Sequence, residues 1–551
     1  MPSLSYSCGQ SELPLIGETI GAHLRRVVER CGDREALVCV HQHYRATYRE
    51  FWDQVEAVAK GLLALEIRKG DRVGIWSPNR FEWVLIQYAT ARIGAIMVNI
   101  NPAFKAQGLE YALKQSQIDL LIAARGFRKT DYVDLLNHVR PYCEYPKRTL
   151  ILERDWTKFL EGGRKIPTAR LDEIETGLQF DDPVNIQYTS GTTGYPKGAT
   201  LSHHNILNNG FFIGERMAFT EQDRLCIPVP FYHCFGMVLG NMACTTHGAC
   251  MVIPAESFDP AITLKTVHDE RCTALHGVPT MFIAELALPD FASYDLSSLR
   301  TGIMAGSPCP VETMKQVHAR MHMQQVTIAY GMTETSPVSV MTWADDPFDK
   351  QVSTVGTTLP YVEVKIIDPA TGRIVPRGHP GELCTRGYSV MLGYWDNEAD
   401  TRLAIDRAGW MHTGDLAEMD AEGYVKITGR IKDVIIRGGE NISPREIEEF
   451  LLRHEGVSEA YVIGVPSQKY GEEVMAWVRR RDGRDVTEQE LLDYCTGQVA
   501  TYKIPKYWKF VDSFPMTISG KIRKVEMREI SAKELGLEQF KQFKQDYAGE
   551  N

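Results

Sequence analysis

Helix-like and strand-like patterns alternate along the first third of the chain. Apolar residues recur at helical spacing from Tyr48 and again from Phe81. Short apolar runs of strand length follow, at 73–76, 95–98, 119–123 and 149–152. This alternation predicts an α/β architecture of layered sheets and helices.

Three later apolar runs end in turns that suit ligand binding. The run at 225–230 leads into an aromatic stretch at 231–236, and two others end in glycine-containing turns at 303–308 and 329–337. In α/β proteins, ligands usually bind beyond the carboxyl ends of the strands. We therefore expect these turns to contribute to a common site.

The last part of the chain has a pattern of its own. Ser443, Pro444 and Glu446 predict a helix that starts with a capping box, and Thr487 with Glu490 predicts another. Strand-like runs occur at 461–465, 474–478 and 508–511. A segment of about 120 residues with this mixed order is large enough to fold as a separate α+β domain.

Composition places the chain among ordinary globular proteins. Its 551 residues are more than one hydrophobic core usually accommodates, which indicates two or more domains. Of these residues, 44% are hydrophobic and 24% are charged. We find no apolar run of membrane-spanning length and no signal peptide, so the expected location is cytoplasmic, without a transmembrane segment. A net charge of −10 argues against a nucleic-acid partner, because binding phosphates requires clustered Lys and Arg.

The cysteines show no pairing pattern. All 12 are scattered singly, without a C-x-x-C motif, and several lie in apolar surroundings. In such positions a thiol behaves as a small buried hydrophobe. Neither disulfides nor a structural zinc site is expected.

A loop at 189–198 combines the features that a polyphosphate requires. Glycines let backbone N–H groups approach an anion, while hydroxyls and one ammonium add donors. The candidate phosphate-binding residues are Thr189, Ser190, Gly191, Thr192, Thr193, Gly194 and Lys197. An alternating strand pattern precedes the loop and Ser202 starts an expected helix, so we predict a loop between a strand and a helix.

This loop is not a Walker A motif. Pro196 precedes Lys197 where that motif requires glycine, and Gly198 follows where it requires Ser or Thr for magnesium. The difference disfavours a kinase or P-loop NTPase. Considered alone, the loop is also compatible with a Gly/Ser/Thr-rich surface turn.

Together with the motifs that follow it, the loop resembles the signature of the acyl-adenylate-forming enzymes. This AMP-binding superfamily contains acyl-CoA synthetases, luciferases and peptide-synthetase adenylation domains, and the similarity extends from about Thr47 to Lys524. It implies an α/β fold with a large N-terminal domain of several subdomains at 1–429. A small mobile α+β lid domain would follow at 430–551, with a hinge near 430–433.

The resemblance also assigns an ATP site. The residues expected around the adenine are Tyr330, which would stack on it, Gly331 of the same turn, and Gly306, Ser307 and Pro308. Thr333 would donate to the α-phosphate and Glu334 would hold Mg²⁺. One carboxylate is enough, because Mg²⁺ that bridges phosphates keeps several waters. The alternative for Glu334 is a solvated loop acid.

Ribose and lid contacts follow from the same resemblance. Asp415, after a glycine turn, is the expected ribose anchor, since one carboxylate can accept from two hydroxyls. Arg430 would be a second ribose or phosphate contact, and Lys432 would be the hinge residue. Lys521 is the expected catalytic residue, although a lysine at a Ser-Gly turn is usually solvated. In a second lid orientation, Gly439 would line the pantetheine tunnel of coenzyme A.

The acyl side of the site is less specific. His233 is expected beside the substrate carboxylate in the wall of an acyl pocket, and a histidine satisfied within the core is the alternative. The run at 238–251 suits an apolar cavity or a packed core equally well. Basic residues at 479–481, Lys503 and Lys506 would either meet the phosphates of coenzyme A or be solvated charges.

The resulting prediction is an ATP-dependent acyl-CoA synthetase of the acid–thiol ligase type. It would use ATP and Mg²⁺ to make acyl-AMP, then coenzyme A to make acyl-CoA, with a medium-chain fatty acid as the expected substrate. Short-chain, hydroxy or aryl acids and transfer to a carrier protein remain alternatives. So does a nucleotide-binding protein with a degenerate site, which the retained motif residues disfavour. The sequence is also compatible with a homodimer.

Overall fold

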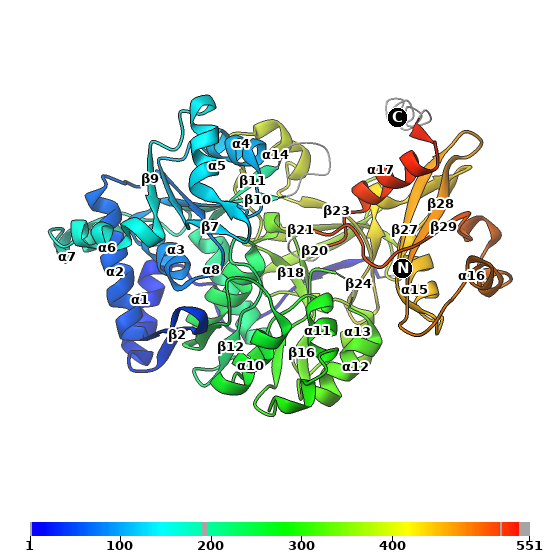
Figure 1. The fold of residues 1–551 in the computed structure, drawn as a ribbon, viewed down its shortest axis with the longest axis horizontal. Coiled ribbons are helices and arrows are strands. Elements are labelled where there is room, and N and C mark those ends of the chain that lie inside the picture. Colours follow the sequence, from blue (N-terminus) through cyan, green and yellow to red (C-terminus); the bar gives the residue numbers. More distant parts are fainter. Residues whose placement is uncertain (1–2, 190–195, 308, 518–520, 539–551) are drawn as a thin grey trace.

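The computed structural model describes residues 3–189, 196–307, 309–517 and 521–538. Figure 1 shows a large body of sheets and helices and a smaller body beside it that contains β27, β28, α16 and α17. Within the described residues, no helix is long and apolar enough to cross a bilayer. All 12 cysteines fall in this part of the chain, and none forms a disulfide there.

The first large sheet carries the predicted alternation of helices and strands. Its strand order is β22 (Gly393–Tyr394), β11 (Lys197–Ser202), β10 (Pro183–Thr189), β5 (Ile96–Asn99), β4 (Arg72–Trp76), β6 (Leu120–Ala123) and β9 (Arg148–Ile151). The strands from β10 to β9 are parallel. Helices α2 (Tyr48–Ala64) and α3 (Phe81–Ile93) begin at the two predicted residues, which confirms both helices.

A second seven-stranded sheet lies next to the first. Its order is β16 (Gln325–Thr327), β15 (Thr301–Ile303), β14 (Ala274–Leu275), β12 (Arg224–Cys226), β13 (Cys250–Ile253), β2 (Glu35–Cys39) and β3 (Tyr44–Thr47). The largest core cluster contains residues of both sheets and of α3, and twelve residues of α3 are buried. This helix therefore packs as an internal element between other layers.

The strand expected at 225–230 is shorter than predicted. β12 ends at Cys226, although the Ile227 N–H still donates to Val252 O over 2.9 Å. Pro228 and Pro230 follow, and proline cannot donate to a strand ladder. The chain then enters a fully buried π-helix, η3 (Phe235–Met242), of a kind often found at functional sites.

The expected position of the phosphate loop is also wrong in one respect. β10 and β11 form an antiparallel pair in which Thr189 lies opposite Lys197, so the loop joins two strands. Helix α8 (His203–Arg216) starts only after β11, where Ser202 accepts a 3.2 Å hydrogen bond from the Asn205 N–H. Residues 190–195 lie outside the described residues. Since α8 does not follow the loop directly, its dipole does not serve a phosphate there.

Besides the two-stranded pair of β7 (Gly126–Phe127) and β8 (Thr130–Asp131), the large body contains two smaller sheets. One has the order β1 (Tyr6–Cys8), β20 (Val362–Ile367), β21 (Gly381–Gly387), β23 (Met411–Met419) and β24 (Val425–Arg430). The other contains β17 (Ala329–Gly331), β18 (Val338–Met341) and β19 (Thr357–Thr358). Together they bring Tyr330 of β17 and Asp415 of β23 into hydrogen-bond contact.

The smaller body is a sheet with helices and its own hydrophobic clusters. Its strands are β26 (Glu440–Ile442), β25 (Ile435–Arg437), β28 (Gly471–Arg480), β27 (Val457–Ser467) and β29 (Tyr507–Phe510). The helices are α15 (Pro444–Leu451), α16 (Glu488–Cys495) and α17 (Lys524–Glu534). The predicted fold class, an α/β protein with a large domain and a small α+β lid domain, is confirmed.

One of the two predicted capping boxes is present. At α16, Thr487 and Glu490 bond reciprocally as predicted. At α15 the prediction is wrong, because the Ser443 hydroxyl donates instead to Thr428 O over 2.8 Å. Glu446 pairs with Lys503 at 2.7 Å. Ser443 thus fastens the start of α15 to β24.

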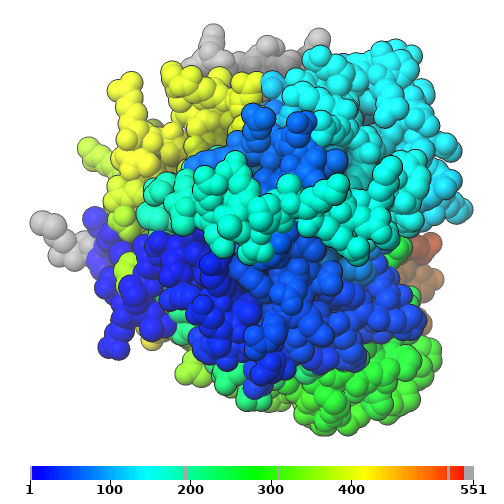
Figure 2. Space-filling view, turned by 90° about the vertical axis from the view of Figure 1, so that its left-hand side faces the viewer, coloured from blue at the N-terminus to red at the C-terminus, as the bar shows by residue number. Residues whose placement is uncertain are grey.

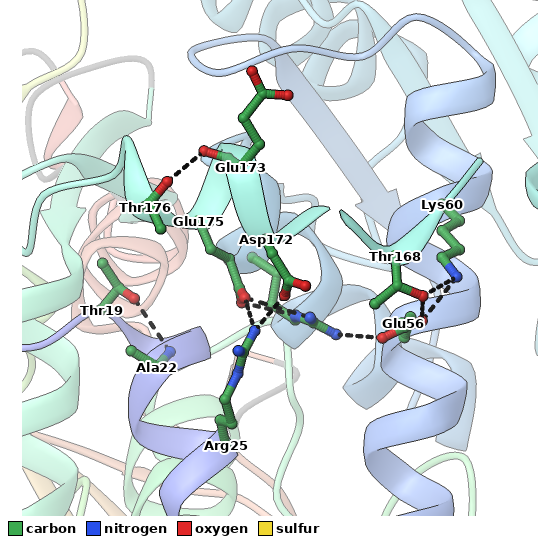
Figure 3. Close-up of polar contacts among 11 residues, drawn as sticks. Thr19, Ala22, Arg25, Glu56, Lys60, Thr168, Asp172, Glu173, Glu175 and Thr176 are labelled. Atoms are coloured by element: carbon green, nitrogen blue, oxygen red, sulfur yellow. Dashed lines mark hydrogen bonds and ion pairs between the residues drawn. The ribbon is translucent and has the colours of Figure 1, made fainter. Parts of the chain in front are cut away.

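An ion-pair network fastens the outer helices of the large body. Arg92, fully buried on α3, donates through Nε to Glu175 of α7 (Thr168–Thr176) over 2.8 Å. Arg25 of α1 (Ile20–Cys31) joins the same carboxylate, and Figure 3 shows how these side chains converge. In Figure 2 the teal segment that contains α7 crosses the face built by the blue N-terminal helices. The pairing supplies the counter-charge that a buried guanidinium requires.

Candidate active site

Three residues from three strands form one hydrogen-bonded group. The Tyr330 hydroxyl of β17 donates to Asp415 Oδ2 over 2.7 Å, and Arg430 Nε of β24 donates to Asp415 Oδ1 over 2.8 Å. Asp415 is buried on β23 and follows Gly414, whose φ is +70°. The carboxylate is therefore fixed within a strand rather than carried by a separate turn. Each of its oxygens retains capacity to accept a further hydrogen bond.

The residues of this group influence one another's pKa values. The negative charge of Asp415 raises the pKa of Arg430. Burial, followed by the nearby carboxylate, raises the pKa of Tyr330 well above its usual range. At neutral pH the Tyr330 hydroxyl is therefore neutral and the Arg430 guanidinium is charged.

Glu334 is a buried acid, which excludes the solvated-loop alternative. It lies in the short 3₁₀ turn η5 (Thr333–Thr335) and is 5% exposed. The Tyr394 hydroxyl donates to Glu334 Oε1 over 2.8 Å, and the Met391 N–H donates to the Glu334 backbone oxygen over 2.9 Å. Burial raises the pKa of Glu334, while the hydrogen bond from Tyr394 and two lysines lower it in part.

Lys197 lies on the other side of Tyr394. Its ammonium forms a 2.9 Å ion pair with Asp400 of α14 (Glu398–Ala404) and is 5.2 Å from the centre of the Tyr394 ring. The pair with Lys197 lowers the pKa of Asp400. Tyr394 thus stands between the lysine of the phosphate loop and the buried acid Glu334.

Lys521 of the smaller body reaches this site in the larger one. A Cβ built on Gly306 would lie 3.8 Å from Lys521 Cε, so the lysine stem packs against that glycine. At its base, the Lys521 N–H donates to Thr517 Oγ1 over 3.0 Å. Desolvation and then the charge of Arg430 lower the pKa of Lys521, although the residue still exposes surface to water, which limits the shift.

His233 lies at the same place, half-buried at the start of the π-helix. Its Nδ1 accepts a 3.2 Å hydrogen bond from the Phe235 N–H, which assigns the ring proton to Nε2. Surrounding protein atoms and then Lys521 lower the pKa of His233 to about 3. The ring is therefore neutral at physiological pH and offers an N–H donor, and its partial exposure favours the pocket over the core alternative.

Sequence reasoning missed several side chains of this site. Tyr394 and Asp400 hold Glu334 and Lys197, as described above. Cys234 is buried, and its thiol donates to Gln187 Oε1 over 3.1 Å. Burial and then the charge of Glu334 raise the pKa of Cys234 to about 12. The only available signal was proximity to motif residues, because the pairings join segments far apart in the chain.

Not every predicted residue meets at the site in this structure. Gly439 and Lys432 are exposed on the smaller body. An added Cβ at Gly439 would approach no described heavy atom within 4 Å beyond its chain neighbours. Thr189 is half-buried at the end of β10, and Ser307 and Gly331 are exposed. Ser190, Gly191, Thr192, Thr193, Gly194 and Pro308 lie outside the described residues.

The basic residues considered for coenzyme A are engaged within the small domain. Arg479 pairs with Glu459 at 2.5 Å, and Lys503 pairs with Glu446. Lys506 lies 3.8 Å from Glu473. These contacts favour ordinary surface ion pairs over a phosphate site.

Comparisons with known proteins agree with this arrangement. The pattern of the AMP-binding enzyme family matches residues 24–395, and that of the AMP-binding enzyme C-terminal domain matches residues 446–521. The chain is 50% identical to the putative acyl-CoA synthetase YngI of Bacillus subtilis, over 94% of this chain and 97% of that protein. It is 44% identical to the mitochondrial medium-chain acyl-CoA ligase ACSF2 of Danio rerio, over 97% and 91% of the two chains.

Among solved structures, the anthranilate CoA ligase AuaEII in complex with anthranoyl-AMP superposes with a TM-score of 0.84. Its sequence is 26% identical, and the match covers 96% of this chain and 99% of that one. ATP-bound MatB from Rhodopseudomonas palustris gives a TM-score of 0.80 at 29% identity, over 94% and 99%. With two family patterns along most of the chain and relatives of 40% identity or more over nearly all of it, the chain belongs to the AMP-binding enzyme family.

Proposed function

We propose that this protein is an AMP-forming acid–CoA ligase that converts a carboxylic acid, ATP and coenzyme A into acyl-CoA, AMP and pyrophosphate. The observation that carries the proposal is the position of Lys521. This cation of the small domain lies against Gly306, within electrostatic reach of His233, Glu334 and Asp415 in the large domain. This position supports a role for Lys521 as the positive charge needed where an acid meets the α-phosphate of ATP.

The chemistry requires two half-reactions. A carboxylate is a poor electrophile at neutral pH, and a thiol does not displace its oxygen directly. Attack of the acid on the α-phosphorus expels pyrophosphate and forms a mixed anhydride, which converts that oxygen into part of a good leaving group. The thiol of coenzyme A then attacks the acyl carbon, and AMP departs.

In the first half-reaction, one anion must approach another. We propose that this repulsion is reduced by Lys521, by the N–H donor of His233 and by the hydroxyl of Thr333, which is buried in η5. Fixed donors and charges in a dry site each contribute on the order of several kcal/mol to such a step. Asp415, already held by Tyr330 and Arg430, has acceptor capacity left for the ribose hydroxyls.

The residues present also fit a magnesium ion. Glu334 is a buried carboxylate with Oε1 held by Tyr394, and Mg²⁺ is usually bound by one or two carboxylates together with phosphates and water. When bound, the ion would neutralise phosphate charge. Glu334 would hold it, and Tyr394 would keep that carboxylate oriented.

The second half-reaction requires a different lid position. In this structure, Lys521 packs against Gly306, whereas Gly439 is exposed. The sheet of the large domain ends with β24 at Arg430, and the sheet of the small domain begins with β25 at Ile435. We place the hinge in the intervening segment, at Lys432, so that rotation withdraws Lys521 and brings Gly439 to the thiol.

A medium-chain fatty acid is the proposed substrate. The ACSF2 relatives are named medium-chain acyl-CoA ligases and cover nearly the whole chain. The buried π-helix that follows His233 contains apolar side chains, among them Met237 and Leu239, that would suit an apolar acyl chain. An aryl acid is the second candidate, because AuaEII, with 26% identity, is an anthranilate CoA ligase.

A panel of carboxylic acids tests this proposal. Straight-chain acids from two to eighteen carbons and aromatic acids would be offered with ATP, Mg²⁺ and coenzyme A, and AMP, ADP and acyl-CoA would be measured. We expect AMP and acyl-CoA in equal amounts, with a maximum at medium length. Formation of ADP, or indifference to every acid, would reject the function, whereas a maximum with aromatic acids would reject only the substrate.

A further inference from the structure

Outside the site described above, three side chains of different chemistry meet on one face of the sheet that carries Asp415. Glu382 and Cys384 lie on β21, and His412 lies on β23, where Cys384 and His412 are register partners. His412 Nδ1 is 3.0 Å from Glu382 Oε2 and 3.6 Å from Cys384 Sγ. All three ligand atoms lie within 4.8 Å of one another.

We propose that Glu382, Cys384 and His412 form a binding site for a zinc-like divalent cation. Thiolate, imidazole and carboxylate are the ligands that zinc prefers, and three protein ligands plus one water complete a tetrahedral set. Bond lengths of about 2.0 Å to nitrogen and oxygen and about 2.3 Å to sulfur give tetrahedron edges of about 3.3 to 3.6 Å. The two distances measured from His412 Nδ1 are close to these edges.

The surroundings supply a second, independent indication. The other ring nitrogen of His412, Nε2, faces Asp406 Oδ2 at 3.8 Å. A carboxylate behind a metal-bound histidine orients the ring and increases its basicity. Glu382 Oε1 meanwhile accepts a 3.1 Å hydrogen bond from the Gly414 N–H, so this ligand is also held from behind.

The local charges balance a dication. The buried Cys384 thiol must lose its proton to bind an ion, because the thiolate is the form that ligates a metal. On binding, the S–H bond breaks, its proton leaves to solvent, and the imidazole proton resides on Nε2, facing Asp406. The two carboxylates and the new thiolate offset the cation and Lys365, whose ammonium packs 4.3 Å over Trp410 beside the site.

The site is accessible to solvent, and it lies close to the hydrogen-bonded group of Tyr330, Asp415 and Arg430. The side chain of His412 is 32% exposed, whereas Cys384 is fully buried beneath it, so an ion would enter past the imidazole. His412 precedes Asp415 by three residues on β23. The spacing of the cysteines gave no indication of a structural zinc site. Spacing along the chain does not reveal this cluster, because its ligands come from two separate strands.

Direct metal binding to the full-length protein without ATP tests the proposal. Zn²⁺ binding would be measured by competition with a chromophoric chelator, and Co²⁺ binding by its thiolate charge-transfer absorption. We expect one ion per chain, release of one proton, and a melting temperature that rises with Zn²⁺ concentration. His412→Gln and Cys384→Ser should abolish the cobalt–thiolate band, and Asp406→Asn should weaken binding by about tenfold.

Two controls separate this site from others. Cys8→Ser removes an exposed thiol at the far strand of the same sheet, and Glu334→Gln removes the proposed magnesium ligand. Neither should change the cobalt–thiolate band. Zinc affinity that is unaffected by His412→Gln, in a variant with a wild-type circular dichroism spectrum, would overturn the proposal. So would the absence of a cobalt–thiolate band in the wild-type protein.

Discussion

The two sides of the active site are built in different ways. On the large-domain side, Asp415 and Glu334 are buried and each is held by hydrogen bonds from neighbouring elements. On the lid side, Lys521 sits on a turn of the small domain and remains exposed to solvent. The large-domain side is therefore held in place before a ligand binds, and we propose that the lid supplies a charge that can be withdrawn.

This difference also separates binding from catalysis. A group held in place before ATP arrives contributes to affinity without a reorganisation cost at the moment of reaction. A cation on a movable domain contributes only in the orientation that brings it to the phosphate.

Removing the lid charge should have the largest effect. Lys521→Ala is expected to slow acid-dependent pyrophosphate exchange by about a thousandfold, the scale of losing a fixed charge at a reacting centre. Lys506→Ala, which removes another lysine of the small domain, should leave exchange near the wild-type rate. Exchange in Lys521→Ala within threefold of wild type would remove this residue from the first half-reaction.

Obstructing the other lid face should affect the opposite half-reaction. Gly439→Leu is expected to slow thioester formation from supplied acyl-AMP by at least about tenfold while leaving pyrophosphate exchange intact. Gly439 has φ of +91°, so any side chain there also strains the backbone. Gly497→Leu is the matched control, because Gly497 is exposed with φ of +77° and nothing within 4 Å of an added Cβ among the described residues.

On the preorganised side, Asp415→Asn should weaken nucleotide binding. The change removes the charge that Arg430 and Tyr330 hold, and a hydrogen bond to a charged group contributes about 1.5–3 kcal/mol. We therefore expect the KM for ATP to rise by about ten- to a hundredfold. The KM for the acid should change little, and an equal rise in both values would show a general loss of structure.

The smallest effect is expected at Tyr394. Tyr394→Phe removes a hydrogen bond that lowers the pKa of Glu334, so that pKa should rise further above its usual value. Since the ionised form is the one proposed to hold Mg²⁺, activity should be lost at a higher pH on the acid side than in wild type. A hydrogen bond from a hydroxyl to an ionised carboxylate at the lower end of its range contributes about 1.5 kcal/mol, which corresponds to a shift of roughly one pH unit.

A second readout sharpens that prediction. The Mg²⁺ concentration for half-maximal rate should rise a few-fold in Tyr394→Phe at fixed pH. Tyr142→Phe, at a tyrosine that is 66% exposed, should change neither the pH profile nor the Mg²⁺ dependence. An unchanged Mg²⁺ requirement in Tyr394→Phe would mean that the hydrogen bond does not position Glu334.

Sequence patterns predicted helices correctly where the periodicity or the capping residues lie within the helix itself. The periodicity from Tyr48 and Phe81 located α2 and α3, and Thr487 with Glu490 located α16. The prediction failed after the phosphate loop, because the antiparallel pairing of β10 with β11 depends on partners elsewhere in the sheet. It failed at Ser443 because a tertiary acceptor, Thr428 O, replaced the local cap.

The residues of the site show the same difference between local motifs and contacts that only the tertiary structure makes. Motif order identified Tyr330, Asp415 and Arg430, which the structure joins by hydrogen bonds. It did not identify Tyr394 as the partner of Glu334, since those residues are 60 positions apart. The Glu382–Cys384–His412 cluster was missed for the same reason, because sequence spacing does not reveal pairing between strands.

We propose that Lys521 serves only the first half-reaction because the lid withdraws it before the thiol arrives. The most direct test supplies acyl-AMP and coenzyme A to Lys521→Ala and measures single-turnover formation of the thioester. The account predicts a rate close to wild type, in contrast to the loss of pyrophosphate exchange in the same preparation. A loss of thioester formation equal to the loss of exchange would contradict it.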